Sequence, residues 1–247
     1  MSFSFKTKRS SIRMSTKVTA GNNNKMVGIG DEAPDFELKD EEGRVHKLSS
    51  FRGRRVILSF FRYASCPVCL YNIDRLKQQE AMLERAGIVT LCIFRSTPEM
   101  VKRAIKGTNE DTHTLSDVKG LVYNKFQVKQ LGAIAAIKRR FTQMPKILKE
   151  GGKYYPYLDM KMISEDREGV DAAMKQLPAD FLIDENGIIV DLLRSKEPND
   201  YMVFKRIEAF IPEDKRCKCN NKYCISPTCR ENYEQIRKDA ESMLCSW

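Results

Sequence analysis

The chain has 247 residues, of which 42% are hydrophobic and 31% are charged, a composition typical of a folded protein rather than a disordered or collagen-like one. Its apolar runs are far shorter than the roughly 20 residues that a membrane span needs, which excludes an integral membrane protein. An excess of 43 Lys and Arg over 33 Asp and Glu gives a net charge of +10, which by itself would indicate a nucleic-acid-binding protein.

The positive charge is concentrated in two segments. Residues 1–25 contain six basic residues and no acid, and residues 129–161 contain eight basic residues against two acids. The rest of the chain is mildly acidic and no nucleic-acid-binding motif accompanies the charge, so we expect no nucleic acid partner. Residues 1–25 lack the apolar stretch of a secretory signal and fit either a disordered basic tail or an organelle transit peptide. We therefore expect a cytoplasmic protein, or a mitochondrial or plastid one if the tail is a transit peptide. Its cysteines should be thiols, redox-active pairs or metal ligands rather than a structural disulfide framework.

The predicted elements begin with strands and then alternate with helices. The predicted strands are short apolar or β-branched runs, at about residues 30–38, 45–48, 55–61, 88–94, 180–183 and 188–193. The predicted helices show helical apolar spacing or a capping residue, at about residues 66–85, 96–105, 119–126 and 199–210. The early alternation and the final hairpin, which contains Asn-Gly, predict an α/β fold with a mixed central sheet flanked by helices.

Three segments follow from this pattern. We assign residues 1–25 to the basic tail, residues 26–212 to one α/β domain, and residues 213–247 to a Cys-rich C-terminal extension. Within the domain, residues 129–162 form a basic insertion, which we interpret as a helical cover over the sheet edge. An amphipathic helix that touches an anionic membrane surface or an acidic partner is the alternative.

Cys66 and Cys69 form a Cys-Pro-Val-Cys motif where the strand at 55–61 is predicted to pass into a helix. The unpaired amide groups and partial positive charge of a helix N-terminus stabilise a thiolate and lower its pKa. A second cysteine one turn later can react with the oxidised first sulfur to form a disulfide. Arg62 and Tyr63, just upstream, would add positive charge and a hydroxyl donor. The pattern favours redox chemistry over a zinc half-site or two inert buried thiols.

Four segments carry a more specific pattern, namely GDEAPDFEL at 30–38, LSFFRYASCPVC at 58–69, LSDVKG at 115–120 and PADFLID at 178–184. They resemble the peroxiredoxin-like branch of the alkyl hydroperoxide reductase/thiol-specific antioxidant (AhpC/TSA, redoxin) family, over about residues 27–211. The resemblance implies a thioredoxin-like fold and thiol-based reduction of peroxides or disulfides, with thioredoxin or glutathione as reductant. We expect a peroxide substrate and no required cofactor, and a homodimer is compatible with the pattern.

Two departures from the family pattern bear on the mechanism. Typical peroxiredoxins have Pro-x-x-x-Thr/Ser-x-x-Cys, in which the last cysteine is peroxidatic; here Arg62 stands at the Pro and Cys69 at that cysteine. A thioredoxin would instead use the first cysteine, Cys66, as the attacking nucleophile. The pattern therefore leaves open which of Cys66 and Cys69 attacks first. Pro178 stands where peroxiredoxins often have a catalytic Arg and where thioredoxin-like proteins have a Pro, generally cis. We predict a cis Leu177–Pro178 bond, the alternative being an ordinary Pro that enters a strand.

The missing arginine weakens the prediction of an efficient peroxidase. Arg62, Arg95 and Arg194 lie at or near predicted strand ends and are the candidates to replace it. Cys92 lies within a predicted buried strand, so we expect it to be a core residue.

The C-terminal extension carries a second group of thiols. Four cysteines fall within 13 residues, Cys217, Cys219, Cys224 and Cys229. Four thiolates are enough for a structural, tetrahedral zinc site. A thiol relay to the Cys-x-x-Cys pair, and free thiols or facultative disulfides, are the alternatives.

The sequence therefore predicts a peroxiredoxin-like thiol oxidoreductase that reduces peroxides through a cycle of Cys66 and Cys69. Arg62, Tyr63 and Pro178 would line the substrate site. A thioredoxin-like disulfide reductase with little peroxidase activity is the first alternative. A zinc-stapled interaction module with a vestigial redox site is the second.

Overall fold

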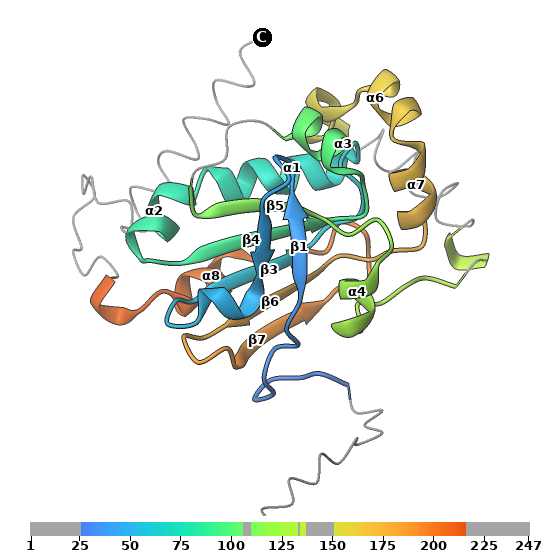
Figure 1. Cartoon of the computed structure of the whole chain (residues 1–247). Helices are drawn as coiled ribbons and strands as arrows, with labels where there is room; N and C mark the ends of the chain where they lie inside the picture. The colour runs from blue at the N-terminus through green and yellow to red at the C-terminus, as the bar shows by residue number, and fades with distance from the viewer. Residues whose placement is uncertain (1–25, 106–109, 133, 137–150, 216–247) are drawn as a thin grey trace, which may run out of the picture.

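A seven-stranded mixed sheet forms the centre of the molecule (Figure 1). A computed structural model describes residues 26–105, 110–132, 134–136 and 151–215. The strands are β1 (Glu37–Asp40), β2 (Val45–Lys47), β3 (Val56–Phe60), β4 (Val89–Phe94), β5 (Thr112–Ser116), β6 (Ala179–Ile183) and β7 (Ile189–Arg194). The α-helices are α1 (Pro67–Lys77), α2 (Glu80–Arg85), α3 (Pro98–Ala104), α4 (Leu121–Lys125), α6 (Met160–Glu165), α7 (Arg167–Ala173) and α8 (Phe204–Phe210). The short 3-10 helices are η1 (Leu48–Phe51), η2 (Gly151–Lys153), η3 (Tyr155–Tyr157) and η4 (Glu213–Lys215).

The sheet has the spatial order β2-β1-β5-β4-β3-β6-β7. β3 pairs with β4 in parallel, and β4 pairs with β5 in parallel. β6 joins β3 from the other side in the antiparallel direction, and β7 returns antiparallel to β6 after the predicted hairpin. The predicted mixed sheet is therefore confirmed, and β3, the strand that leads into Cys66, lies inside the sheet with a partner on each side.

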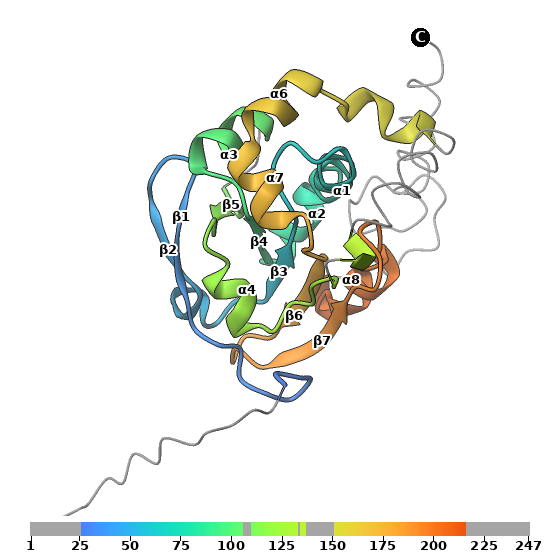
Figure 2. The ribbon, with the colours of Figure 1, turned by 90° about the vertical axis from the view of Figure 1, so that its right-hand side faces the viewer.

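Helices cover both faces of this sheet (Figure 2). α1, α2 and α8 lie on one face, where Leu83 of α2 and Phe210 of α8 pack with Ile57 of β3 in one buried cluster. α4 lies on the opposite face, where Tyr123 and Phe126 belong to a second cluster. Every residue of β3, β4 and β6 is buried as a result. Burial on both faces explains why these strands have nearly continuous apolar sequences rather than alternating ones.

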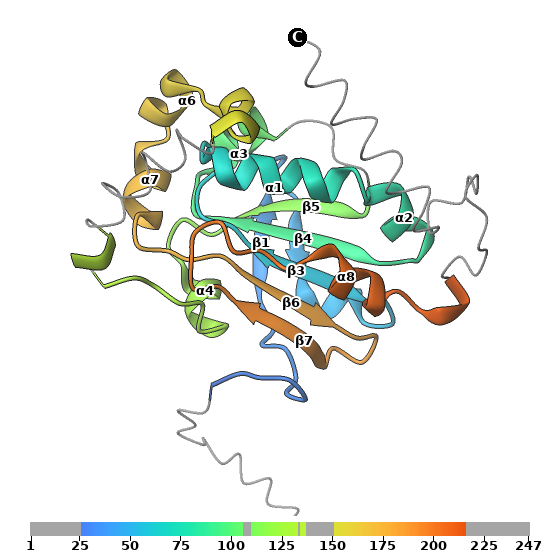
Figure 3. The same cartoon turned by 180° about the vertical axis from the view of Figure 1, so that it is seen from behind.

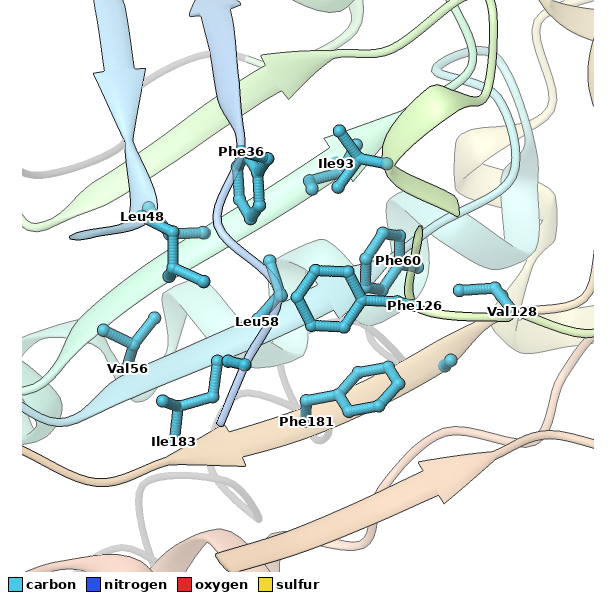
Figure 4. Packing of buried hydrophobic residues seen from close by; sticks show 14 of the residues in the cluster. Phe36, Leu48, Val56, Leu58, Phe60, Ile93, Phe126, Val128, Phe181 and Ile183 are labelled. Carbon is cyan, nitrogen blue, oxygen red and sulfur yellow. The ribbon is translucent and has the colours of Figure 1, made fainter. Parts of the chain in front are cut away.

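The second cluster holds β3 rigidly in place (Figure 4). The rings of Phe60, Phe126 and Phe181 lie with centroids 5.1 to 5.8 Å apart, from β3, the end of α4 and β6 respectively. Burying a side chain of this size stabilises a fold by roughly 1.5–3 kcal/mol. Phe60 is the last residue of β3, so this packing fixes the point from which the chain leaves the sheet toward the Cys-x-x-Cys motif.

α6 and α7 lie beside α3 at one end of the molecule, as both Figure 1 and Figure 3 show. An ion pair between Arg103 of α3 and Glu165 of α6 joins the two elements. The described part of the predicted insertion also covers helix α1. The Tyr154 ring meets the Tyr71 ring edge-on at 5.3 Å, and the Tyr157 hydroxyl donates a hydrogen bond to Asp74 at 2.7 Å.

The structure differs from the predicted elements at several positions, and the strand predicted at 30–38 begins only at Glu37. β5 was not predicted, because Thr112–Ser116 is short and mostly polar; it forms because β4 and β1 pair with it on either side. The predicted helix at 66–85 is divided into α1 and α2 by a turn in which Gln79 N donates to Leu76 O. The turn allows α2 to pack into the α8 side of the core. The predicted helix at 199–210 begins only at Phe204, since the preceding residues make tertiary contacts described below.

The predicted tail at 1–25, residues 137–150 of the insertion and the extension from residue 216 lie outside the described residues. The predicted limits of the three segments therefore stay predictions. Among the helices that the structure describes, none is long and apolar enough to cross a membrane.

Candidate active site

The two cysteines lie at the start of helix α1, directly after β3. Cys66 is the N-cap residue, Pro67 occupies the first turn, and the Cys66 carbonyl accepts the first helical hydrogen bond from Leu70 N at 2.9 Å. Proline suits this position because its missing N–H would be unpaired there. Cys66 is 2% exposed and Cys69 is fully buried, and both are free thiols. The predicted strand–motif–helix arrangement is thus confirmed, in a setting that excludes bulk water.

The two thiols differ strongly in acidity. A hydrogen bond from the Cys69 side chain lowers the pKa of Cys66 to about 6 against the cost of burial, and the Arg62 charge and the amide groups of Cys69 and Val68 contribute. Burial and the adjacent Cys66 sulfur raise the pKa of Cys69 well above its usual range. Cys66 is therefore the more acidic of the two thiols, and negative charge on the pair is favoured at Cys66 rather than at Cys69.

Arg62 lies beside the Cys66 sulfur. Its Nη1 lies 4.0 Å from the Cys66 sulfur, and its guanidinium carbon lies 5.2 Å from the centre of the Tyr63 ring. Burial lowers the pKa of Arg62, but the nearby Cys66 and Tyr63 outweigh this and raise it above its usual range, so Arg62 stays charged. Its Nε is buried without a hydrogen-bond partner among the described residues. The guanidinium is held chiefly by its electrostatic attraction to the thiolate and by the Tyr63 ring.

The other two candidates, Arg95 and Arg194, donate hydrogen bonds to backbone carbonyls away from the cysteine sulfurs. Arg95 Nε donates to Val118 O at 3.1 Å, and Arg194 Nη2 donates to Phe126 O at 3.0 Å. Backbone carbonyls on the α4 side of the sheet thus engage both side chains. Of the three candidates, Arg62 is the one that the structure brings to the cysteines.

The predicted cis Leu177–Pro178 bond is wrong. The bond is trans, and no cis peptide bond occurs among the described residues. Pro178 lies just before β6, and its carbonyl accepts a hydrogen bond from Ser195 N at 3.2 Å. This is the position at which a sheet tolerates proline, since the first residue of a strand need not donate to the ladder. Phe60 pairs with the following residue, Ala179, so Pro178 still lies beside the start of the loop that leads to the cysteines.

Tyr201 is a site residue that the sequence reasoning missed. Its hydroxyl donates a hydrogen bond to the Cys69 sulfur at 3.4 Å, and its ring packs on Phe61 with centroids 5.5 Å apart. Tyr201 lies between β7 and α8, more than 130 residues from Cys69. Nothing in its local sequence signals this contact, because only the tertiary fold brings the segment to α1.

Asp166, between α6 and α7, is a second residue that was missed. Its Oδ2 accepts hydrogen bonds from Ser65 N at 3.1 Å, Ser65 Oγ at 2.9 Å and Ser96 Oγ at 2.9 Å. Ser96 Oγ in turn accepts a hydrogen bond from Ala64 N at 2.8 Å. These side chains are buried. A carboxylate from a distant element thus holds the two residues that precede Cys66.

The other cysteines lie either in the core or outside the described residues. Cys92 is fully buried in β4 within the cluster that surrounds the motif, as predicted, and burial raises its pKa above the usual range. The predicted zinc ligands Cys217, Cys219, Cys224 and Cys229 lie outside the described residues. Within the part of the chain that the structure describes, no group of three or more His, Cys, Asp or Glu could hold a metal ion.

The profile of the AhpC/TSA family matches residues 29–192, more than half of the chain and a range that includes both cysteines. The chain belongs to the AhpC/TSA family. Peroxiredoxin Bcp of Escherichia coli (strain K12) is 32% identical to this chain over 99 residues, which are 40% of this chain and 64% of the relative. The thiol-disulfide oxidoreductase ResA of Geobacillus thermodenitrificans is 31% identical over 74 residues, 30% of this chain and 42% of the relative. The chain therefore spans less than two thirds of the length of each relative.

A solved structure confirms the predicted fold. The thiol peroxidase from Chromobacterium violaceum superimposes with a TM-score of 0.50 and 16% sequence identity, over 77% of this chain and 89% of that one. At this identity the likeness concerns the fold alone. Tyr201 lies beyond the residues that the family profile matches, so its contact with Cys69 is a feature read from this chain's own structure.

Proposed function

We propose that the protein is a thiol-dependent peroxidase in which Cys66 attacks the peroxide and Cys69 resolves the oxidised product. The observation that carries this proposal is the unequal acidity of the pair. Cys66 sits at a helix N-terminus beside Arg62, with its pKa lowered to about 6, whereas burial keeps the proton on Cys69. Only the thiolate is nucleophilic, so the first cysteine is the attacking one.

The first step transfers one oxygen atom. The Cys66 thiolate attacks the terminal peroxide oxygen, an S–O bond forms and the O–O bond breaks. The sulfur is oxidised to a sulfenic acid, and the alkoxide that leaves takes up a proton to become an alcohol. We assign to Arg62, whose Nη1 lies 4.0 Å from the Cys66 sulfur, the role of stabilising the negative charge as it moves from sulfur to the leaving oxygen.

The second step closes the disulfide and the third reopens it. The Cys69 sulfur attacks the Cys66 sulfenic acid, the S–S bond forms, and the hydroxide that leaves combines with the Cys69 proton to give water. An external dithiol or two thiols then reduce the disulfide and are themselves oxidised. We assign this reducing role to thioredoxin or to glutathione.

Single cysteine variants test this assignment. Thiol-dependent consumption of hydrogen peroxide is measured with a thioredoxin system for the wild-type protein and for Cys66→Ser, Cys69→Ser and the double variant. We expect Cys66→Ser to be inactive and Cys69→Ser to stop after one turnover with a sulfenic acid on Cys66, detected by trapping and mass spectrometry. Cys92→Ala is the matched control, since Cys92 is a buried thiol outside the motif. Full peroxide consumption by the double variant would refute the proposal.

A disulfide reductase is the second candidate function. Two observations favour it, namely Pro178 in place of the arginine of typical peroxiredoxins and the similarity to a relative named thiol-disulfide oxidoreductase. Reduction of insulin disulfides measures this activity directly. Cys69→Ser would then trap mixed disulfides with protein substrates through Cys66, and peroxide would leave the variant unoxidised.

Zinc binding by the C-terminal cysteines is a separate proposal, which rests on the spacing of Cys217, Cys219, Cys224 and Cys229 alone. Metal analysis of the purified full chain, together with a thiol titration, tests it. Absence of bound zinc in protein purified without chelators would reject the zinc site and the interaction-module hypothesis that depends on it.

A further inference from the structure

The position of Tyr201 is fixed through β3, the strand that leads into the cysteine motif. The amide N–H of the next residue, Met202, donates to Asp180 Oδ2 at 2.8 Å, and Ser59 Oγ of β3 donates to Asp180 Oδ1 at 2.7 Å. Asp180, Ser59 and Met202 are all buried. This anchor holds the backbone extended ahead of α8 and places the Tyr201 hydroxyl 3.4 Å from the Cys69 sulfur.

The reactions of Cys66 and Cys69 indicate a role for the Tyr201 hydroxyl as a hydrogen-bond donor. Cys69 must carry negative charge twice in each cycle, once when it attacks the oxidised Cys66 and once when it leaves as the disulfide is reduced. Its surroundings oppose this, because burial and the adjacent Cys66 sulfur raise its pKa. A hydrogen bond to a charged sulfur is stronger than one to a neutral thiol, so a fixed donor favours the thiolate. Burial also raises the pKa of Tyr201 well above its usual range, so the phenol retains its proton and stays a donor.

We propose that Tyr201 is a catalytic residue of the second half of the cycle, whose hydroxyl donates a hydrogen bond to the Cys69 sulfur as that sulfur gains negative charge. The inference rests on the proposed function for the resolving step. In that step the Cys69 S–H bond and the Cys66 S–O bond break, the S–S bond forms, and the proton and hydroxide leave as water. In the reducing step an external thiolate attacks the Cys66 sulfur, and the electron pair of the S–S bond passes to Cys69. Tyr201 keeps its proton throughout both steps.

Tyr201→Phe tests this role, because it removes the hydroxyl and keeps the ring that packs on Phe61. Rapid mixing with hydrogen peroxide is followed by acid quenching and mass spectrometry, which separates formation of the Cys66 sulfenic acid from its conversion to the disulfide. We expect the first rate to stay within about twofold and the second to fall about 10- to 100-fold, as for loss of a hydrogen bond to a charged group. Tyr157→Phe, which removes a hydroxyl bonded to Asp74 of the same helix, is the control and should change neither rate.

A second measurement does not depend on peroxide chemistry. The protein is oxidised with diamide, and the rate of reduction of the Cys66–Cys69 disulfide by dithiothreitol is measured for the wild type and Tyr201→Phe. Slower reduction of the variant supports the role of Tyr201, even if the wild-type protein proves unreactive toward peroxide and the proposed function fails. Tyr201→His retains a donor and should recover part of the lost rate. Equal slowing of sulfenic acid formation and resolution, unchanged rates of resolution and reduction, or no recovery in Tyr201→His would overturn the proposal.

Discussion

Replacement of Arg62 by methionine should raise the pKa of Cys66 by about two units. Arg62 Nη1 lies 4.0 Å from the Cys66 sulfur. Two unit charges at this distance attract each other by about 4 kcal/mol at an effective dielectric constant of about 20, which corresponds to about three pKa units. The guanidinium charge is spread over atoms farther from the sulfur, so we expect a smaller shift, from the pKa of about 6 to about 8.

The expected result is a change in the pH profile. At pH 7 the thiolate fraction of Cys66 should fall from about nine tenths to about one tenth, so its reaction with peroxide should slow about tenfold. The reaction should recover as the pH is raised to about 9, because the thiolate forms again above its new pKa. The assay is alkylation of Cys66 by iodoacetamide between about pH 5 and pH 10, quantified on the Cys66 peptide by mass spectrometry, together with the initial rate of peroxide loss.

Arg194→Met is the control for losing a half-buried guanidinium, since Arg194 bonds to backbone carbonyls and not to the sulfurs. Arg194→Met should leave the midpoint of the pH dependence of Cys66 alkylation unchanged. A midpoint for Arg62→Met within half a unit of the wild type would refute the electrostatic reasoning. The hydrogen bond from the Cys69 side chain and the amide groups of Cys69 and Val68 would then account for the acidity of Cys66.

Three further predictions concern stability. Asp166→Ala leaves the donors of Ser65 and Ser96 without their acceptor, and should lower the free energy of unfolding by about 3 kcal/mol in chemical denaturation; an unchanged denaturation midpoint would contradict this. Gly169→Ala places a methyl group against Ser96 Oγ and Asp166, and should cost about 1–3 kcal/mol in the same assay, whereas Gly152→Ala, in open space, should cost far less. Asp40 is buried, yet hydrogen bonds with His46 and Arg44 lower its pKa to about 2. Ionised Asp40 therefore contributes about 2 kcal/mol to the free energy of unfolding. This contribution is present above about pH 4 and is lost as the pH falls through 2. Asp40→Asn should remove this part of the acid dependence, which unfolding curves at pH 3 and pH 6 would measure.

The parts of the site that the sequence predicted are those carried by a continuous segment. Cys66, Cys69 and Arg62 all lie within eight residues, and their arrangement follows from a strand that ends and a helix that begins. Such local geometry is determined by hydrophobic periodicity and by helix N-terminal chemistry, both of which are visible in the sequence. The order of strands and helices around them could be predicted for the same reason.

The contacts that the sequence could not show join segments far apart in the chain. Asp166 reaches Ser65 across 101 positions, and Tyr201 reaches Cys69 across 132. Neither has a spacing or motif of its own, because their roles arise only after the sheet and α6–α7 have packed. The trans bond before Pro178 is a similar case, since an X-Pro bond can adopt either isomer and the residue types do not decide between them.

The tertiary fold also overrode local preference. Residues 199–203 were predicted to be helical, but Met202 N bonds to the Asp180 carboxylate and Tyr201 to Cys69, which keeps this segment out of α8. The polar segment Thr112–Ser116 gave no clear strand signal, yet it lies between β4 and β1 and completes the sheet. In both cases a partner from another part of the chain decided the conformation.

The two sulfurs stand on a single turn of α1, with Cys66 at the cap and Cys69 three residues later. Two cysteines on separate elements would first have to be brought together before a disulfide could form between them. In the proposed cycle no helix has to melt, because the resolving sulfur is already within reach. The sulfenic acid would therefore be short-lived, and a second peroxide would have little time to drive it to the sulfinic acid, from which a thiol cannot recover it. In the proposed cycle, this arrangement would therefore favour sustained turnover at high peroxide.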